Sequence, residues 1–240
     1  MNHRLFFCAL LSWCVSNAVG QETSQKRSFG FVAKNVEVGV TNIDSFVARN
    51  YIPNPNHYYQ GQVAYKGWER GKSPLPWNYC AELVRDNHAD LSSLAGKQAQ
   101  SRFVPGYRIL WMDGFGATQG LEHYGNVEML FKDNILISFL ADVDSVQFKR
   151  ETYYHGAPLL KNTVDTVSCG EALLDKPIII FLHKGQYAWS EGNQKVEVIN
   201  FEVLDKKCFK KNAATLHVFD KVRYDEYVKA MRQYEKQLAK

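Results

Sequence analysis

After its first twenty residues the sequence has no long hydrophobic run, no block of like charges and no internal repeat. Without a later run of about twenty apolar residues, it offers no candidate transmembrane helix. The net charge is only +4, and the lysines at 206–207 and 210–211 are the nearest approach to a basic patch. Nucleic-acid binding therefore has no electrostatic footprint here. Histidines never occur at metal-ligand spacing such as His-x-x-x-His, so we expect neither a metal nor another cofactor.

The first twenty residues have the composition of a signal peptide. Residues 1–4 are positively charged, residues 5–15 form a short apolar run, and residues 16–20 are small enough for cleavage after Ala18 or Gly20. We therefore expect residues 1–20 to be removed and residues 21–240 to form a single secreted or periplasmic domain.

Cysteine is scarce. Of the five cysteines, Cys8 and Cys14 leave with the signal peptide, so Cys80, Cys169 and Cys208 remain. An odd count in an oxidising compartment favours one disulfide and one thiol. Cys169 and Cys208 lie in the C-terminal third with two candidate strands between them, and we expect them to pair. The alternative is that Cys80 pairs with one of them.

What the chain does have is aromatic residues and strand patterns. Hydrophobic residues make up 45% of the sequence, and thirteen tyrosines and fourteen phenylalanines lean toward β-structure. Alternating or continuous apolar segments predict a mainly antiparallel sheet, with strands at 106–112, 126–131, 135–141, 177–182 and in a hairpin over 187–201. The segments 135–140 and 177–182 are nearly all apolar and are expected to be buried. Residues 146–154 also alternate and predict a further strand, whereas Pro53 and Pro55 predict a loop over 50–56.

Helices are predicted in three regions, which makes the fold class α+β. A short helix is expected to start after Thr41 or Asn42 and to reach Arg49. A central helix is expected to open at Pro76, because proline suits the first helical turn, and the apolar spacing that follows fits one helix or two that are broken near Asn87. Residues 224–238 carry apolar side chains at three- and four-residue steps, which predicts a C-terminal amphipathic helix packed across the sheet.

The central helix would carry Cys80 about one turn from its N-terminus. There the helix dipole lowers the pKa of a thiol, and a nearby imidazole can hold the thiolate as an ion pair. His123 precedes a strand, and Asp142 and Asp144 follow the next one. A hairpin turning at 132–134 would bring either aspartate beside His123, where a carboxylate fixes the imidazole tautomer.

This order of parts resembles the transglutaminase-like branch of the papain-like cysteine enzymes over residues 76–145. The resemblance rests on the sequence Cys-Ala-Glu-Leu at 80–83, Val-Pro-Gly-Tyr at 104–107, a histidine before a strand and an aspartate after the next. It implies that Cys80 is the nucleophile, His123 the base, and Asp142 or Asp144 the orienting carboxylate. Tyr-Gly-Asn at 124–126 departs from the family pattern, in which an aromatic-x-Glu follows the histidine closely.

Two functions follow from these observations. The first is an exported thiol hydrolase or acyltransferase that acts on amide or peptide bonds. The second is a non-catalytic exported binding module, rich in β-structure, that recognises a protein or a glycan through its loops. The first requires a reactive Cys80 within hydrogen-bond reach of His123, and the second requires Cys80 to be buried or bridged. The sequence leaves the oligomeric state open.

Overall fold

The computed structural model describes residues 27–33, 36–59, 62–67, 79–86, 91–112, 115–116, 123–144, 147–169, 178–204 and 208–238. The expected signal peptide and Pro76, where the central helix was expected to begin, lie outside these residues. In the described part of the chain, no helix is long and apolar enough to cross a membrane.

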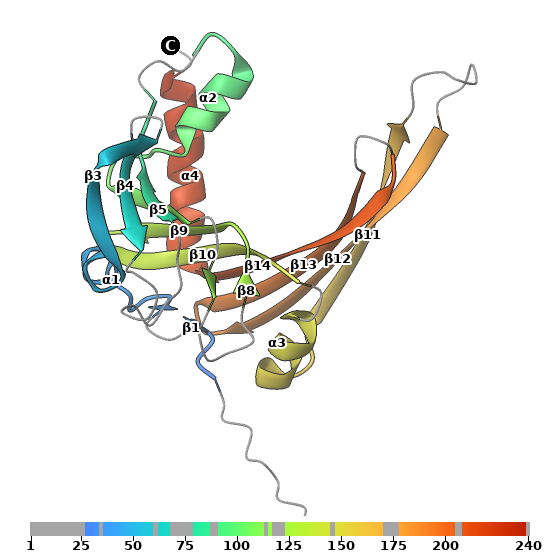
Figure 1. The fold of residues 1–240 in the computed structure, drawn as a ribbon. Coiled ribbons are helices and arrows are strands. Elements are labelled where there is room, and N and C mark those ends of the chain that lie inside the picture. Colours follow the sequence, from blue (N-terminus) through green and yellow to red (C-terminus); the bar gives the residue numbers. More distant parts are fainter. Residues whose placement is uncertain are drawn as a thin grey trace, which may run out of the picture.

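The chain forms an α+β fold organised by one antiparallel sheet of ten strands (Figure 1). In spatial order the strands are β11 (Leu159–Cys169), β12 (Ile178–Glu191), β13 (Gln194–Leu204), β14 (Lys210–Asp220), β10 (Ile135–Val143), β9 (Val127–Lys132), β6 (Tyr107–Met112), β5 (Tyr79–Leu83), β4 (Gln62–Gly67) and β3 (Tyr51–Tyr59). The mainly antiparallel sheet expected from the sequence is confirmed.

The other elements are short, apart from the last helix. Two small ladders join β1 (Phe31–Ala33) to β2 (Val36–Glu37) and β7 (Phe115–Gly116) to β8 (His123–Tyr124). The helices are α1 (Ile43–Asn50), α2 (Leu94–Ser101), α3 (Gln147–His155) and α4 (Lys221–Leu238).

Local sequence explains several of these elements. Asn42 caps α1, since its side chain accepts hydrogen bonds from the backbone N–H groups of Asp44 and Ser45. The β9–β10 turn places Asp133 and Asn134 at φ 51° and 64°, the left-handed backbone that asparagine and aspartate tolerate best after glycine. The expected short helix and this hairpin are both confirmed.

The two faces of the sheet are covered by different segments. On one, called here the N-terminal face, the first core cluster joins Phe29, Val32 and residues of α1 to the sheet. The imidazole of His155 on α3 packs against the ring of Phe29, with the ring centroids 4.1 Å apart, and Trp189 of β12 donates a hydrogen bond from its indole to the Gly156 carbonyl. These contacts hold α3 against the N-terminal face.

The opposite face, called here the helix face, carries α4. Tyr227 packs with Ile109, Leu130 and Ile137 in a second core cluster, and its hydroxyl donates to the Arg102 carbonyl at 2.9 Å. The predicted C-terminal helix packed across the sheet is therefore confirmed. Leu130 of β9 is buried in this cluster, so both faces of β9 contribute to a core.

Two elements differ from the sequence prediction. Residues 147–155 form α3, not a strand, because Phe148, Thr152 and His155 also fit the three- and four-residue steps of a helix. Residues 51–59 form β3 despite Pro53 and Pro55. This is an edge strand whose register is irregular between Pro53 and Tyr58, and an edge tolerates the missing N–H groups.

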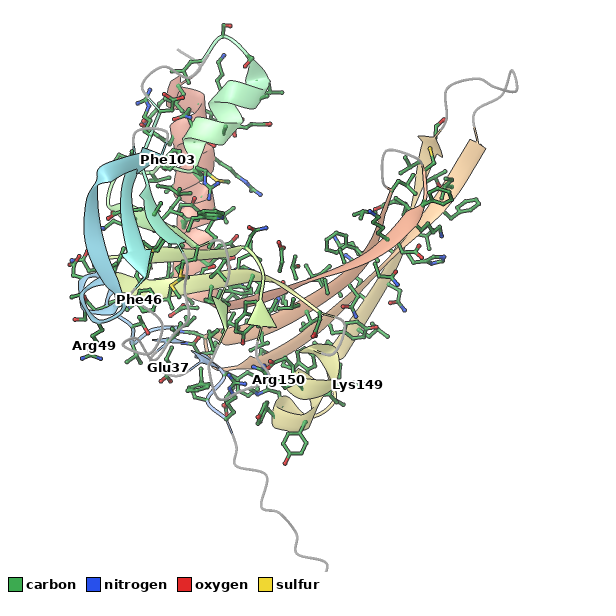
Figure 2. The ribbon with its side chains drawn as sticks, in the orientation of Figure 1. Glu37, Phe46, Arg49, Phe103, Lys149 and Arg150 are labelled. Atoms are coloured by element: carbon green, nitrogen blue, oxygen red, sulfur yellow. The ribbon has the colours of Figure 1, made fainter. Side chains whose placement is uncertain are left out.

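Strands β11 to β14 extend beyond the helices as a curved ribbon (Figure 1). Figure 2 shows side chains standing on both faces of this extension. Ile179 and Phe181 of β12 are 61% and 57% exposed. The strand predicted at 177–182 is therefore present, but its expected burial is wrong.

Candidate functional site

Cys80 lies in the middle of β5, not on a helix. Its backbone is paired with Tyr65 of β4 on one side and Met112 of β6 on the other. The thiol is reduced and 0% exposed, inside the first core cluster. The cysteine-bearing central helix was thus a wrong prediction. A fully buried thiol in a strand has the character of a small hydrophobic side chain.

The carboxylates predicted to complete a triad lie elsewhere on the sheet. The ladder registers align Cys80 with Met112, Val127 and Ala141 in one row across β5, β6, β9 and β10. Since successive residues of a strand point to opposite faces, Asp142 points away from the face that holds Cys80. The three strand spacings between β5 and β10 amount to about 14 Å. The structure therefore does not bring Cys80 and Asp142 together.

Asp142 is engaged locally. Its carboxylate accepts a hydrogen bond from the Asn126 side chain at 2.9 Å, and its backbone bonds to Gly125 and Asn126. A Cβ at Gly125 would approach the Asp142 Cβ to 2.9 Å, so this contact requires glycine. Asp144 is exposed just beyond β10. His123 lies in β8, paired with Gly116, and its side chain is outside the described part of the structure.

The two remaining cysteines are at the far end of the extension. Cys208 is disulfide-bonded and adopts φ 65° two residues before the start of β14. Cys169 is the last residue of β11, and its side chain is not among those described. Pairing of Cys169 with Cys208 therefore stays a prediction.

A groove of about 300 Å³ lies on the extension, and its lining comes from four adjacent strands. The ladders put six of the lining residues on the helix face: Asp165, Leu182, Lys184, Ile199, Phe201 and Thr215. His183 and Glu202 complete the lining. A larger concavity of about 470 Å³ runs along α4, but its described lining belongs to that helix alone. The groove on the extension is therefore the better-built candidate site.

The groove combines an apolar floor with a charged rim. Leu182, Ile199 and Phe201 are half-buried, whereas Asp165 and Lys184 are exposed. Apolar surface with a few fixed polar groups is the usual composition of a ligand site, and about 300 Å³ is at the lower end of the usual size range.

Glu202 lies at the margin of the groove, and the alternation of β13 directs its side chain to the N-terminal face, opposite to Phe201. Its carboxylate accepts hydrogen bonds from the backbone N–H of His183 at 2.8 Å and from the Lys210 ammonium at 3.1 Å. These two bonds, the first being the larger cause, lower the pKa of Glu202 below its ordinary value. Glu202 therefore remains ionised at neutral pH.

A polar cluster occupies the same face where α4 begins to cover it. The imidazole of His217 contacts the Ser138 hydroxyl at 2.8 Å, stacks on Phe219 and meets the ring of Tyr224 edge-on. Burial, and secondarily the charge of Lys195, lowers the pKa of His217 to about 3. The imidazole is neutral at physiological pH, and Ser138 beside it is only 4% exposed. We interpret this serine–histidine contact as a satisfied polar pair of the core, because both partners are buried and each meets the hydrogen-bonding need of the other.

The described residues contain no group of three or more side chains suited to holding a metal ion. Comparison of the chain with protein-family models, curated proteins and solved structures gives no match. The groove was missed in the sequence because its residues come from four strands and carry no motif. The one available signal was the spacing of the apolar residues Ile199 and Phe201 in the hairpin predicted over 187–201.

Proposed function

We propose that this chain is an exported, non-catalytic binding protein that holds a protein segment in the groove of its β-sheet extension. The observation that carries the proposal is the groove itself, with the half-buried Leu182, Ile199 and Phe201 between the charges of Asp165 and Lys184. An apolar side chain of the ligand would rest on the floor, and polar groups flanking it would meet the rim.

The lining favours a protein ligand over a glycan. The described lining residues include Phe201 and His183 but no tryptophan or tyrosine. Sugars usually stack on those amphipathic rings, whose edge also offers a polar group. Charges of both signs around an apolar floor instead match a peptide segment with one apolar anchor.

Thiol chemistry is not proposed, although it was the first function predicted from the sequence. It requires a thiolate that is open to substrate and stabilised by a helix N-terminus or an imidazole. Cys80 is buried in a strand with its backbone paired on both sides, and Asp142 faces the other way.

The test is selection of peptides from a random display library on the purified protein, followed by calorimetry of the enriched peptides. We expect Phe201→Glu to weaken binding at least about tenfold, because the charge would occupy the apolar floor. Val203→Glu is the matched control. Val203 is on the same strand and the same face, is 38% exposed, and does not line the groove.

Failure to enrich any peptide would contradict the proposal, as would binding that Phe201→Glu leaves unchanged. Binding of a glycan array at the groove would overturn the ligand class. Equal losses in both glutamate variants would show that added negative charge, and not the groove floor, weakens the binding.

A further inference from the structure

The sheet ends in a long open edge. Strand β11 is eleven residues long and is paired with β12 along its whole length without a register shift. On its other side no strand of the described chain is hydrogen-bonded to it. Residues 159–168 are all exposed, including Leu159 at 78%.

An edge of this kind is a template for another strand, because half of its backbone N–H and C=O groups point outward. Proteins usually protect such an edge with proline, bulges or several lysines. Between 159 and 169 there is no proline or glycine, one lysine and no bulge. The opposite edge, β3, does carry Pro53, Pro55 and an irregular register. The edge at β3 therefore carries features that hinder pairing with a further strand, whereas the edge at β11 carries none of these and can pair.

We propose that β11 pairs antiparallel with β11 of a second copy of this chain, about a two-fold axis at Thr163. In an antiparallel pair related by such an axis, the sequence numbers of two residues that face each other always add up to twice the number of the residue on the axis. The register centred on Thr163 pairs Leu159 with Val167, Leu160 with Thr166, Lys161 with Asp165, Asn162 with Val164, and Thr163 with its own copy.

Charge selects this register. It is the one antiparallel register that places Lys161 directly opposite Asp165, and the symmetry repeats the pair. The same face receives the Leu159–Val167 contact at both ends and a threonine pair at the centre. Opposite charges, apolar pairs and threonine pairs are the cross-strand combinations that stabilise antiparallel sheets. A shift by two residues in either direction separates the charges and removes these pairings.

The symmetry has a geometric consequence. A two-fold axis perpendicular to the sheet keeps the helix faces of both copies on the same side. The ten-stranded sheet would continue into a twenty-stranded one, with the two grooves flanking the axis. The dimer and the groove share Asp165, which lies on the groove rim, whereas Lys161 does not line the groove. The dimer itself requires no ligand, and Lys161→Asp tests it without altering the groove lining.

The test is the mass of the protein in solution by sedimentation, measured over a range of concentrations. We expect the unaltered chain to form dimers. Lys161→Asp should raise the dimer dissociation constant at least about tenfold, because two attractive pairs become repulsive. Adding Asp165→Lys in the same chain should bring the constant back to within about threefold of the original.

Lys184→Asp is the matched control, since Lys184 is exposed on the neighbouring strand, paired with Thr163, one strand away from the contact. It should leave the dimer unchanged. A chain that stays monomeric at every concentration would overturn the proposal, and so would a dimer that the charge exchange does not rescue.

A covalent measurement checks the register without relying on the charge variants. Thr163→Cys should cross-link to its own copy under mild oxidation, because facing residues of an antiparallel pair come within reach of a disulfide. Lys184→Cys, placed one strand inward, should not. Cross-linking that is equally fast at both positions, or absent at 163, would exclude a two-fold axis at Thr163.

Discussion

The side chain of Cys80 gives the sharpest test at the scale of single residues. Because it is 0% exposed within β5, we expect no alkylation by iodoacetamide in the folded protein between about pH 5 and pH 9. Full labelling should follow denaturation, as read by mass spectrometry of the peptide. Fast labelling of the native protein below neutral pH would instead support the thiol-enzyme interpretation, particularly if His123→Ala abolished it.

His217 makes the fold sensitive to acid. Its pKa is held at about 3 in the folded chain, against about 6.5 when unfolded. Below about pH 6.5 the unfolded chain binds a proton at His217 that the folded chain does not bind. The free energy of unfolding therefore falls as the pH drops from about 6.5 toward 3. The slope due to this one group is about 1.4 kcal/mol per pH unit. Ser138 and Tyr224 contact this imidazole, and the Glu197 carboxylate that faces it across the ladder is ion-paired with Lys195 at 2.6 Å.

We expect His217→Gln to flatten the dependence of unfolding free energy on pH between about 6 and 4, measured by urea denaturation at each pH. Glutamine keeps a hydrogen-bonding side chain near Ser138 but does not titrate. His183→Gln, on the exposed rim of the groove, is the control and should leave the slope as it is. Equal slopes for the unaltered chain and the 217 variant would show that burial does not depress this pKa.

The structural role of some residues can be predicted from the sequence, and that of others cannot. Asn42 was predictable as a helix cap because capping is a local interaction. Cys80 was misread because Ala81, Glu82 and Leu83 favour a helix by intrinsic propensity, and Pro76 suits a helix start. Here tertiary pairing with β4 and β6 overrides that preference, and a single sequence does not display pairing partners.

At the scale of elements, α4 depends on one buried side chain. Tyr227 is 7% exposed in the second core cluster and donates a hydrogen bond to Arg102. Tyr227→Ala should lower the free energy of unfolding by about 3–5 kcal/mol, in the range of other buried aromatic truncations. Tyr227→Phe removes only the hydroxyl and should cost about 0.5–1.5 kcal/mol.

Urea denaturation of both variants measures the difference. Val222→Ala, at a 49% exposed position of the same helix, is the control and should change stability by no more than about 0.5 kcal/mol. If Tyr227→Ala were as mild as Val222→Ala, α4 would not be anchored through this ring.

Elements with strong local signals were predicted correctly. The hairpin of β9 and β10 follows from Asp133 and Asn134, and that of β12 and β13 from Gly192, which adopts φ 56°. The helical spacing of 224–238 sufficed for α4. The strand expected at 146–154 failed because a nine-residue segment can satisfy a period of two and a period of 3.6 together.

At the scale of the whole molecule, the sheet has a covered half and an open half. Strands β9 and β10 lie between the first core cluster on one face and α4 on the other, whereas β11 and the first residues of β12 have few buried neighbours. The sequence did not reveal this division. The apolar run at 178–182 resembles a core strand, and only the long-range order of the strands shows that it lies beyond the helices. The groove and the open edge both result from that position.

Hydrogen exchange of the backbone amides should distinguish the covered half of the sheet from its open half. The amides of β9 and β10, paired on both sides and covered on both faces, should exchange at least about a hundredfold more slowly than those of β11. Mass spectrometry of peptides covering 127–143 and 159–169 measures the exchange of both regions.

This comparison of the two regions is made in the Lys161→Asp variant, which we expect to be monomeric. In the unaltered chain the amides of β11 should gain protection as concentration rises, while β9 and β10 stay constant. Slow exchange of β11 in the monomeric variant would mean that the edge is already covered within one chain, and the second copy would then have no strand to pair with.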